Sequence, residues 1–285
     1  MTDTIVTFAS GATTGRGTVV RSETDPLGRP LVVVDRTPFH PVDHTWPDQP
    51  GDIGTCADGA VADTLMAAAG PDRGLLVGSD IPVKRGEPGW SWFVAHRLAE
   101  ASTAPEVGAE VLLKVDGERR RALSAAHTAC HLSALAMNQA AATFWRKDVR
   151  TDSLGSPDLD QLAMVSSVMD VQGSSDVYRF GKSLRKRGFD PVSFAGALGT
   201  VVDEVETQLA AWLGTRAPVV IADDGDLRVT ARRRWTCSLP EGLAQIACGG
   251  THVPSLAALG CVQVDYRLAS DGAGLTVRTT PTLAA

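Results

Sequence analysis

The chain has 285 residues, a formal net charge of −6 and 44% hydrophobic residues, enough apolar material for one large domain or two smaller ones. The negative balance argues against a uniformly basic surface but allows a local basic patch. No basic-then-apolar leader opens the sequence, no apolar run is long enough to span a membrane, and five scattered cysteines predict reduced thiols in a cytoplasmic protein.

The sequence up to residue 116 is rich in strand signals. Residues 28–40 and 108–116 are β-branched apolar runs bounded by Gly and Asp, and residues 90–99 alternate in the same way. The Pro- and Gly-rich stretch at 40–54 predicts an ordered loop or a series of turns. We therefore expect a small, β-barrel-like N-terminal domain at residues 1–116.

Helix signals dominate after this point. Ala, Leu and Met fill residues 116–145, which predicts a long, mostly buried helix. A second helix is expected at 190–214, with Pro191 near its start and Gly214 at its end. The predicted fold class is α+β, with a second domain at 117–285 in which helices pack on an antiparallel sheet. Its expected strands are 217–223, 227–235, and a hairpin of 261–269 and 275–280.

Two short segments carry side chains that suit a metal ion. His127 and His131 are four positions apart on the first predicted helix, so their imidazoles lie on one face. Cys248 and His252 flank two glycines, a spacing that was not selected for a helix. Three nitrogens and one sulfur suit Zn²⁺. A zinc protease is a poor alternative, because Thr128 stands where that motif needs a Glu as general base.

The motifs around these ligands resemble a known family. "RALSAAHTACHL" and "ACGGTHVPSLAALG", together with "LVVVDRTPFHP" and "QPGDIG" upstream, resemble the editing domain of alanyl-tRNA synthetase. They are also similar to freestanding alanyl-tRNA editing proteins and to the second additional domain of threonyl-tRNA synthetase. The resemblance extends from about residue 30 to about residue 270.

The resemblance implies a function. It implies a β domain followed by an editing domain whose Zn²⁺ site hydrolyses the ester between a wrong amino acid and the acceptor end of tRNA. The ligands would be His127, His131 and Cys248, with His252 as the fourth ligand or close by. Thr128 would read a polar group on the substrate or else pack within its helix. Gln49 aligns with the family Gln. Gly249 and Gly250 would let the backbone approach the ribose or the ester, or would only shape the turn.

One loop departs from the family pattern. The family reads Pro-Glu-Gly-Gly-Gly-Gln-Pro, whereas residues 41–50 read "PVDHTWPDQP", so the glycines are replaced and three residues are inserted. Glycine permits backbone angles that the replacing residues reach less easily. We expect this loop to contact the substrate through Asp43, His44 and Trp46; the alternative is a structural rearrangement that leaves the substrate unchanged. Two substrates remain open: Ser or Gly on alanine tRNA, and a threonine-like amino acid such as fluorothreonine on threonine tRNA.

Basic clusters are candidates for contact with tRNA phosphates. Residues 119–121 and 232–234 each hold three arginines, but the densest cluster is "KSLRKRG". The leading hypothesis is a zinc-dependent hydrolase that acts in trans as a monomer or homodimer with no membrane partner. The alternative is a non-catalytic, zinc-stabilised RNA-binding or regulatory protein. The predicted tRNA-binding residues are Lys182, Arg185, Lys186 and Arg187.

Overall fold

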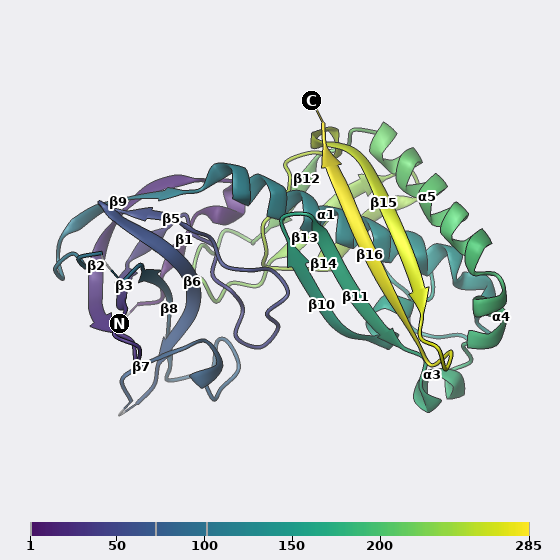
Figure 1. Cartoon of the computed structure of the whole chain (residues 1–285), viewed down its shortest axis with the longest axis horizontal. Helices are drawn as coiled ribbons and strands as arrows, with labels where there is room; N and C mark the ends of the chain where they lie inside the picture. Colours follow the sequence, from purple (N-terminus) through teal and green to yellow (C-terminus); the bar gives the residue numbers. More distant parts are fainter. Residues whose placement is uncertain (1, 72, 101, 285) are drawn as a thin grey trace. The chain divides into compact units, whose positions relative to one another are not determined.

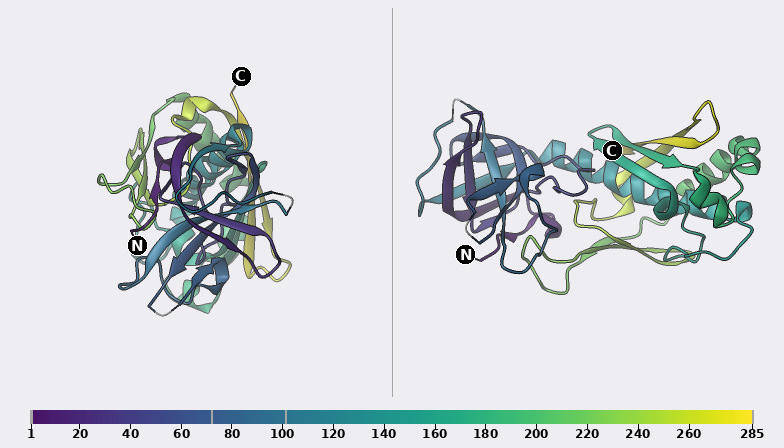
Figure 2. Two further views of the ribbon diagram at one scale, coloured as in Figure 1. Left: turned by 90° about the vertical axis from the view of Figure 1, so that its left-hand side faces the viewer. Right: turned by 90° about the horizontal axis from the view of Figure 1, so that it is seen from below.

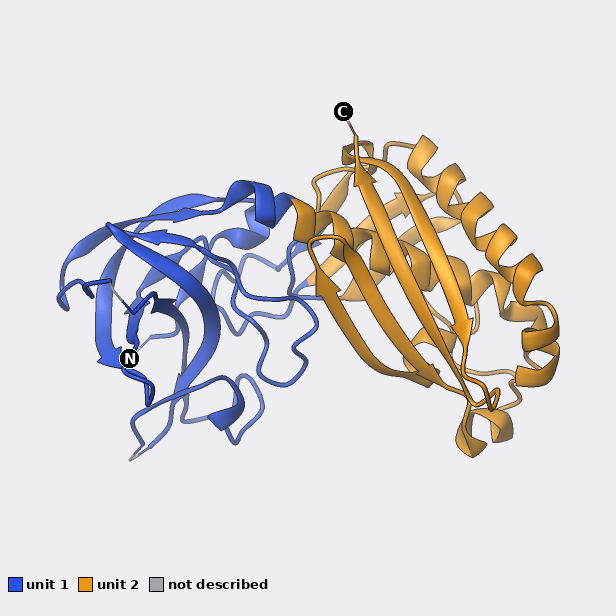
Figure 3. Ribbon diagram, in the orientation of Figure 1, with its two compact units in different colours: residues 1–121, 221–233, 248–251 blue, residues 122–220, 234–247, 252–285 orange. Residues whose placement is uncertain are grey.

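The computed structural model describes residues 2–71, 73–100 and 102–284. Contacts divide the chain into two compact units (Figure 3). Unit 1 comprises Met1–Arg121, Ile221–Arg233 and Cys248–Thr251, and unit 2 comprises the remaining segments Ala122–Val220, Arg234–Ala247 and His252–Ala285. The division of the sequence at residue 116 stays a prediction. The return of two later segments to unit 1 was not expected from the sequence.

Unit 1 is built on a seven-stranded sheet whose pairings are antiparallel, in the order β5-β9-β2-β3-β8-β6-β7. β5 also pairs with β6, so one short strand contacts two strands of the same sheet. The barrel-like form expected here stays a prediction. The predicted strands at 90–99 and 108–116 are confirmed, whereas the run at 28–40 is divided into β3 and β4, which belong to different sheets. The strands of unit 1 are β1 (Ile5–Val6), β2 (Thr14–Thr24), β3 (Pro30–Val34), β4 (Arg36–Thr37), β5 (Gly54–Cys56), β6 (Gly59–Ala69), β7 (Leu75–Val77), β8 (Ser91–Leu98) and β9 (Glu110–Val115).

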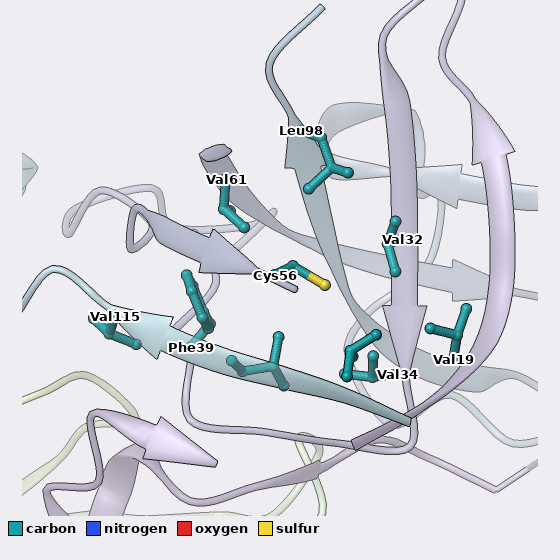
Figure 4. Close-up of a cluster of buried hydrophobic side chains, with 10 residues drawn as sticks. Val19, Val32, Val34, Phe39, Cys56, Val61, Leu98 and Val115 are labelled. Atoms are coloured by element: carbon teal, nitrogen blue, oxygen red, sulfur yellow. The ribbon is translucent and has the colours of Figure 1, made fainter. Parts of the chain in front are cut away.

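Side chains on one face of these strands pack together in a common hydrophobic core (Figure 4). β9 has the burial pattern expected of a strand with one solvated face, with every second side chain buried. The thiol of Cys56 is enclosed by this cluster, and burial raises its pKa to about 11. The cluster consists of Val19, Val32, Val34, Phe39, Cys56, Val61, Leu98, Val111, Leu113 and Val115.

The segment Ile221–Arg233 returns to unit 1 along its first strand. Val6 donates its amide to the carbonyl of Leu227 (2.8 Å), and Val229 donates to Thr4 (2.9 Å). The strand predicted at 227–235 is therefore wrong in its position. Asp226 accepts hydrogen bonds from the backbone and side chain of Arg228, which turns the chain here, and the next strand begins only at residue 234.

Unit 2 combines a long helix with antiparallel sheets (Figure 1). The predicted long helix is confirmed as α1, and the predicted hairpin is confirmed as β15 and β16. The sheet orders are β10-β11-β16-β15 and β12-β13-β14. The start of α1, up to Arg121, and the end of β12, from Ile221, are assigned to unit 1. The elements are α1 (Gly117–Ala140), α2 (Leu159–Ala163), β10 (Met164–Asp170), β11 (Gly173–Arg179), α3 (Lys182–Lys186), α4 (Pro191–Gly196), α5 (Leu198–Gly214), β12 (Val219–Ala222), β13 (Arg234–Leu239), β14 (Gly242–Ala247), β15 (Leu259–Leu268) and β16 (Gly274–Leu283).

The helix predicted at 190–214 is in fact two helices. Asp190 caps α4 by accepting from the amides of Val192 and Ser193, and α4 ends at Gly196. Ala197 leaves the helical region (φ −106°, ψ 12°) before α5 begins. Glycine weakens helix continuity, which explains why the break falls here. The predicted end at Gly214 is confirmed.

The mixed composition of the fold agrees with the predicted class at a coarse level. Helices and several antiparallel sheets are present, and α5 packs against β15 in unit 2 (Figure 2). The hairpins β10–β11 and β13–β14 were not predicted from the sequence. Within the described ranges, none of the helices has the length and hydropathy needed to cross a membrane.

Candidate metal centre

Helix α1 presents two imidazoles from one face. Asp116 precedes the helix and accepts from the amides of Glu118 and Arg119, so it supplies the N-terminal cap of α1. One turn separates His127 from His131, and their ring centroids are 4.7 Å apart. The predicted shared face is confirmed.

The third imidazole comes from the loop after β14. The ring of His252 lies 4.3 Å from that of His127 and 5.0 Å from that of His131, centroid to centroid. One ligand atom from each of His127, His131, Cys248 and His252 lies within 4.8 Å of the others. These four side chains can bind one metal ion, as the sequence predicted.

The chemistry of this group fits a soft or borderline cation. Nε2 of His131 is buried and has no hydrogen-bond partner among the described residues, and burial lowers the pKa of this imidazole to about 3. It is therefore a neutral nitrogen donor. Burial raises the pKa of Cys248 to about 12, so the thiol becomes a good ligand only when a cation displaces its proton.

His96 in unit 1 is a buried histidine whose ring nitrogens are both hydrogen-bonded, unlike those of His131. His96 is fully buried, but its Nε2 pairs with the hydroxyl of Thr37 (2.8 Å) and its Nδ1 with the carbonyl of Val32 (3.0 Å). Both ring nitrogens are used by the fold. A histidine of this kind is a structural core residue, whereas His131 keeps a donor atom available.

Thr128 has three hydrogen-bond partners. Its hydroxyl donates to the carbonyl of Ser124 (2.9 Å), accepts from the amide of Val253 (3.2 Å) and lies 3.2 Å from Nδ1 of His252. The residue is fully buried. In this arrangement Thr128 holds the ring of His252, an outer contact of the type that orients metal-binding histidines. The sequence offered substrate reading or packing for Thr128 and did not suggest this role.

Gln49 forms two hydrogen bonds with Thr251, in the loop between Cys248 and His252. Its Nε2 donates to the hydroxyl of Thr251 (2.8 Å), and its Oε1 accepts from the amide of Thr251 (3.1 Å). Gln49 is fully buried and Thr251 nearly so. Both ends of the Gln49 amide therefore fix the residue next to His252. The sequence singled out Gln49 but not this partner.

The two glycines of the loop differ in their surroundings. The amide of Gly250 points to the sulfur of Cys248 (3.4 Å). A Cβ added to Gly249 would meet only the guanidinium of Arg85, at 3.8 and 4.0 Å. Gly249 is half-buried, and crowding around a side chain does not require a glycine there.

The altered loop is anchored by its own side chains in unit 1. One oxygen of Asp43 accepts from the amide of Thr45 (2.7 Å) and of Trp46 (3.2 Å), and the other pairs with Arg85 (3.1 Å). Buried His44 contacts the carbonyl of Val83 at 3.0 Å. Trp46 is 44% exposed, so it is the member of the predicted set that presents a free surface.

A buried ion pair supports the segment that follows Gln49. Arg120 forms a two-point pair with Asp52, one contact of which is 2.9 Å long, and also donates to the carbonyl of Pro38 (2.8 Å). Asp52 in turn accepts from the amide of His40 at 2.5 Å. Arg120 is consequently not available to phosphates, although it belongs to one of the basic clusters noted in the sequence. This pair and Arg85 are site-supporting residues that sequence reasoning missed.

Trp235 closes the imidazole group from one side. This fully buried residue of β13 lies edge-on to His131, with ring centroids 5.3 Å apart. An apolar surface of this kind, which excludes water, strengthens electrostatic interactions with a bound cation.

No protein-family model and no curated protein sequence matches the chain.

Proposed function

We propose that the protein is a zinc-dependent aminoacyl-tRNA deacylase that acts in trans, related to the alanyl-tRNA editing proteins and editing domains that its motifs resemble. The observation that carries the proposal is the group of four ligand-competent side chains at the resembling motifs. Because aminoacyl-tRNA is the substrate, we further propose a cytoplasmic monomer or homodimer. No membrane partner is included in the proposal.

The reaction needs correct placement more than a strong nucleophile, because an ester is intrinsically labile. Zinc bound there would polarise the ester carbonyl or lower the pKa of a bound water to about 7. The residues of the chain would supply the rest. His127, His131, Cys248 and His252 would hold the ion, and Thr128 would keep the ring of His252 in place.

The loop beside the ligands would receive the substrate. Gln49 would fix Thr251, and so the backbone between Cys248 and His252, before the substrate arrives. The backbone of the half-buried Gly249 would approach the ribose or the ester. Such preorganised backbone groups stabilise developing negative charge without reorganisation during the reaction.

The amino acid removed would be set by the altered loop. Asp43 and His44 support its shape, and the exposed indole of Trp46 is the group best suited to contact a substrate. The two candidate classes are Ser or Gly on alanine tRNA, and a threonine-like amino acid such as fluorothreonine on threonine tRNA. A deacylation assay across a panel of mischarged tRNAs, including threonine analogues, tests both. No hydrolysis of any member would refute the proposed activity.

The metal is tested separately by elemental analysis. Purified protein should hold one Zn²⁺ per chain, and His131→Ala should lose most of it, because the deleted imidazole is a direct ligand. Asp148→Ala, which removes an exposed carboxylate away from the ligand group, should retain full zinc. Full zinc in His131→Ala would show that the assignment is wrong.

A second function is favoured by one feature of the same group. Four protein ligands satisfy a tetrahedral zinc site, and closed sites of this kind are usually structural. The competing proposal is a non-catalytic, zinc-stabilised RNA-binding or regulatory protein. It predicts protein that binds both zinc and tRNA yet hydrolyses no member of the panel.

A further inference from the structure

Two distant segments of unit 2 bring six cationic side chains together. α3 and the residue after it carry four of them, and the segment after α1 carries two. All six residues are exposed. We call this surface the basic patch; its residues are Arg146, Lys147, Lys182, Arg185, Lys186 and Arg187.

Backbone contacts hold the two segments side by side. The amide of Arg146 donates to the carbonyl of Gly188 (2.9 Å), and a bridge joins Trp145 to Phe189. The ammonium of Lys147 donates to the carbonyl of Lys186 (3.0 Å). Gly188 allows this approach: its φ is +107°, and a Cβ there would lie 3.0 Å from Lys147. The patch is thus a product of the fold and not of one sequence run.

An aromatic cluster makes the base of the basic patch rigid. The ring of Phe189 lies 5.1 Å from that of Trp145, 5.2 Å from that of Phe180 and 5.6 Å from that of Phe194. Phe189 is 3% exposed, as is Leu184 of α3. The cations therefore project from a packed base, which reduces the ordering that binding requires.

The charge of the basic patch is not cancelled locally. Asp190 pairs with Arg146, but among the described residues no ion pair engages Lys182, Arg185, Lys186 or Arg187. The whole chain carries a net charge of −6, so this concentration of cations does not follow from a generally basic composition. A surface of unpaired Lys and Arg suits a polyanion with regularly spaced charges.

Within unit 2, the basic patch is remote from His127. α1 continues for 13 residues from His127 to its end at Ala140, which corresponds to about 20 Å along the helix axis. Arg146 and Lys147 follow that end in the sequence. A partner that reaches both places must extend well beyond an amino acid and one nucleotide.

We propose that the basic patch binds the phosphates of the tRNA body, with Arg146 and Lys147 as contacts in addition to the α3 cluster. This inference rests on the proposed function for the identity of the RNA. It deepens that function by separating a phosphate-binding surface from the ester-binding loop. The patch then contributes to affinity for the whole tRNA and not to the chemistry at the ester.

The test is binding of uncharged tRNA, measured by fluorescence anisotropy between about 50 and 200 mM salt. Lys147→Gln should reduce the slope of log affinity against log salt by about 1, because one phosphate contact is lost. The triple variant of Arg185→Gln, Lys186→Gln and Arg187→Gln should reduce it by about 2 to 3. Arg267→Gln is the matched control, since Arg267 is exposed but paired with Asp265 elsewhere in the unit. It should leave the slope unchanged.

A second measurement separates the basic patch from the proposed activity. Hydrolysis of a seryl or threonyl ester of adenosine, which has no tRNA body, should proceed at the same kcat/KM in wild type and in the triple variant. An unchanged salt slope in both Lys147→Gln and the triple variant would overturn the patch while leaving the deacylase proposal intact. Binding of anionic vesicles in place of tRNA would overturn it too. Patch-dependent binding of tRNA without any hydrolysis would support the patch and refute the deacylase.

Discussion

At the scale of single residues, Thr128 provides a sharp test of how the ligand group is held. Thr128→Val keeps the shape but removes the hydroxyl that contacts Val253 and His252. Loss of an outer contact to a ligating histidine typically lowers metal affinity 10–100-fold, and we expect a change of that order. Chelator competition measures it. Thr128→Ser retains the hydroxyl and should restore most of the affinity; equal zinc affinity in all three proteins would contradict the orienting role.

The sequence predicted the group of four candidate metal ligands better than it predicted the hydrogen bonds that hold their loop in place. His127 and His131 share a helix face, and Cys248 and His252 share one loop, so each pair was visible from local spacing. The hydrogen bonds between Gln49 and Thr251 join residues 202 positions apart, and no local sequence pattern predicts them. The contact of Asp43 and His44 with substrate stays a prediction, and the hydrogen bonds that both form within unit 1 were not expected from the sequence.

At the scale of elements, the altered loop can be tested without damaging its anchors. Trp46→Ala removes an exposed side chain, so melting temperature and zinc content should stay close to those of wild type. The ranking of kcat/KM among seryl, threonyl and threonine-analogue esters should change, because a contact to the amino acid is lost. Val192→Ala, which trims an 80% exposed side chain on α4, is the control. An unchanged ranking would show that this indole does not select the substrate.

Helix α2 contains a carboxyl group with a measurable effect on stability. Burial raises the pKa of Asp160 to about 6, while a hydrogen bond from Tyr178 (2.9 Å) opposes the shift. Because the folded pKa is raised, Asp160 contributes stability that is fully present below about pH 4 and is lost as pH rises through about 6. Asp160→Asn abolishes this loss. Relative to wild type, the variant should gain about 2–3 kcal/mol between pH 4 and pH 7 in denaturant unfolding.

The control for this prediction is Asp148→Asn. It deletes the same charge at an exposed position, so its stability relative to wild type should change little over that pH range. A gain in Asp148→Asn equal to that in Asp160→Asn would attribute the effect to net charge and would contradict the burial argument.

Prediction of elements succeeded where one signal was strong. The composition of α1 and the turn between β15 and β16 were sufficient to identify them. The break at Ala197 lies inside a continuous apolar helical pattern, and the glycine before it was not recognised as the end of a helix. β10 and β11 contain many Ser and Asp residues, so their alternation is weakly hydrophobic and was not recognised.

At the scale of the whole molecule, the units are not continuous pieces of sequence. A fragment ending at Arg121 lacks the backbone of residues 221–233, including Leu227 and Val229, which bond to the first strand. Buried amides without partners are costly, so we expect the fragment to be less stable than the same unit in the full chain. Hydrogen exchange of Val6 reports this directly. Equal protection of Val6 in both proteins would contradict the expectation.

This discontinuity has a consequence for the order in which the protein is made. The ribosome delivers the chain from its N-terminus, and domains generally fold as they emerge. The last residues of unit 1, Cys248–Thr251, appear only after most of unit 2 has been synthesised. Until the later segments of unit 1 emerge, Val6 lacks its hydrogen bond to Leu227, or Gln49 lacks its hydrogen bonds to Thr251. A chain that stalls before residue 251 would therefore be more exposed to proteases in unit 1 than the complete protein.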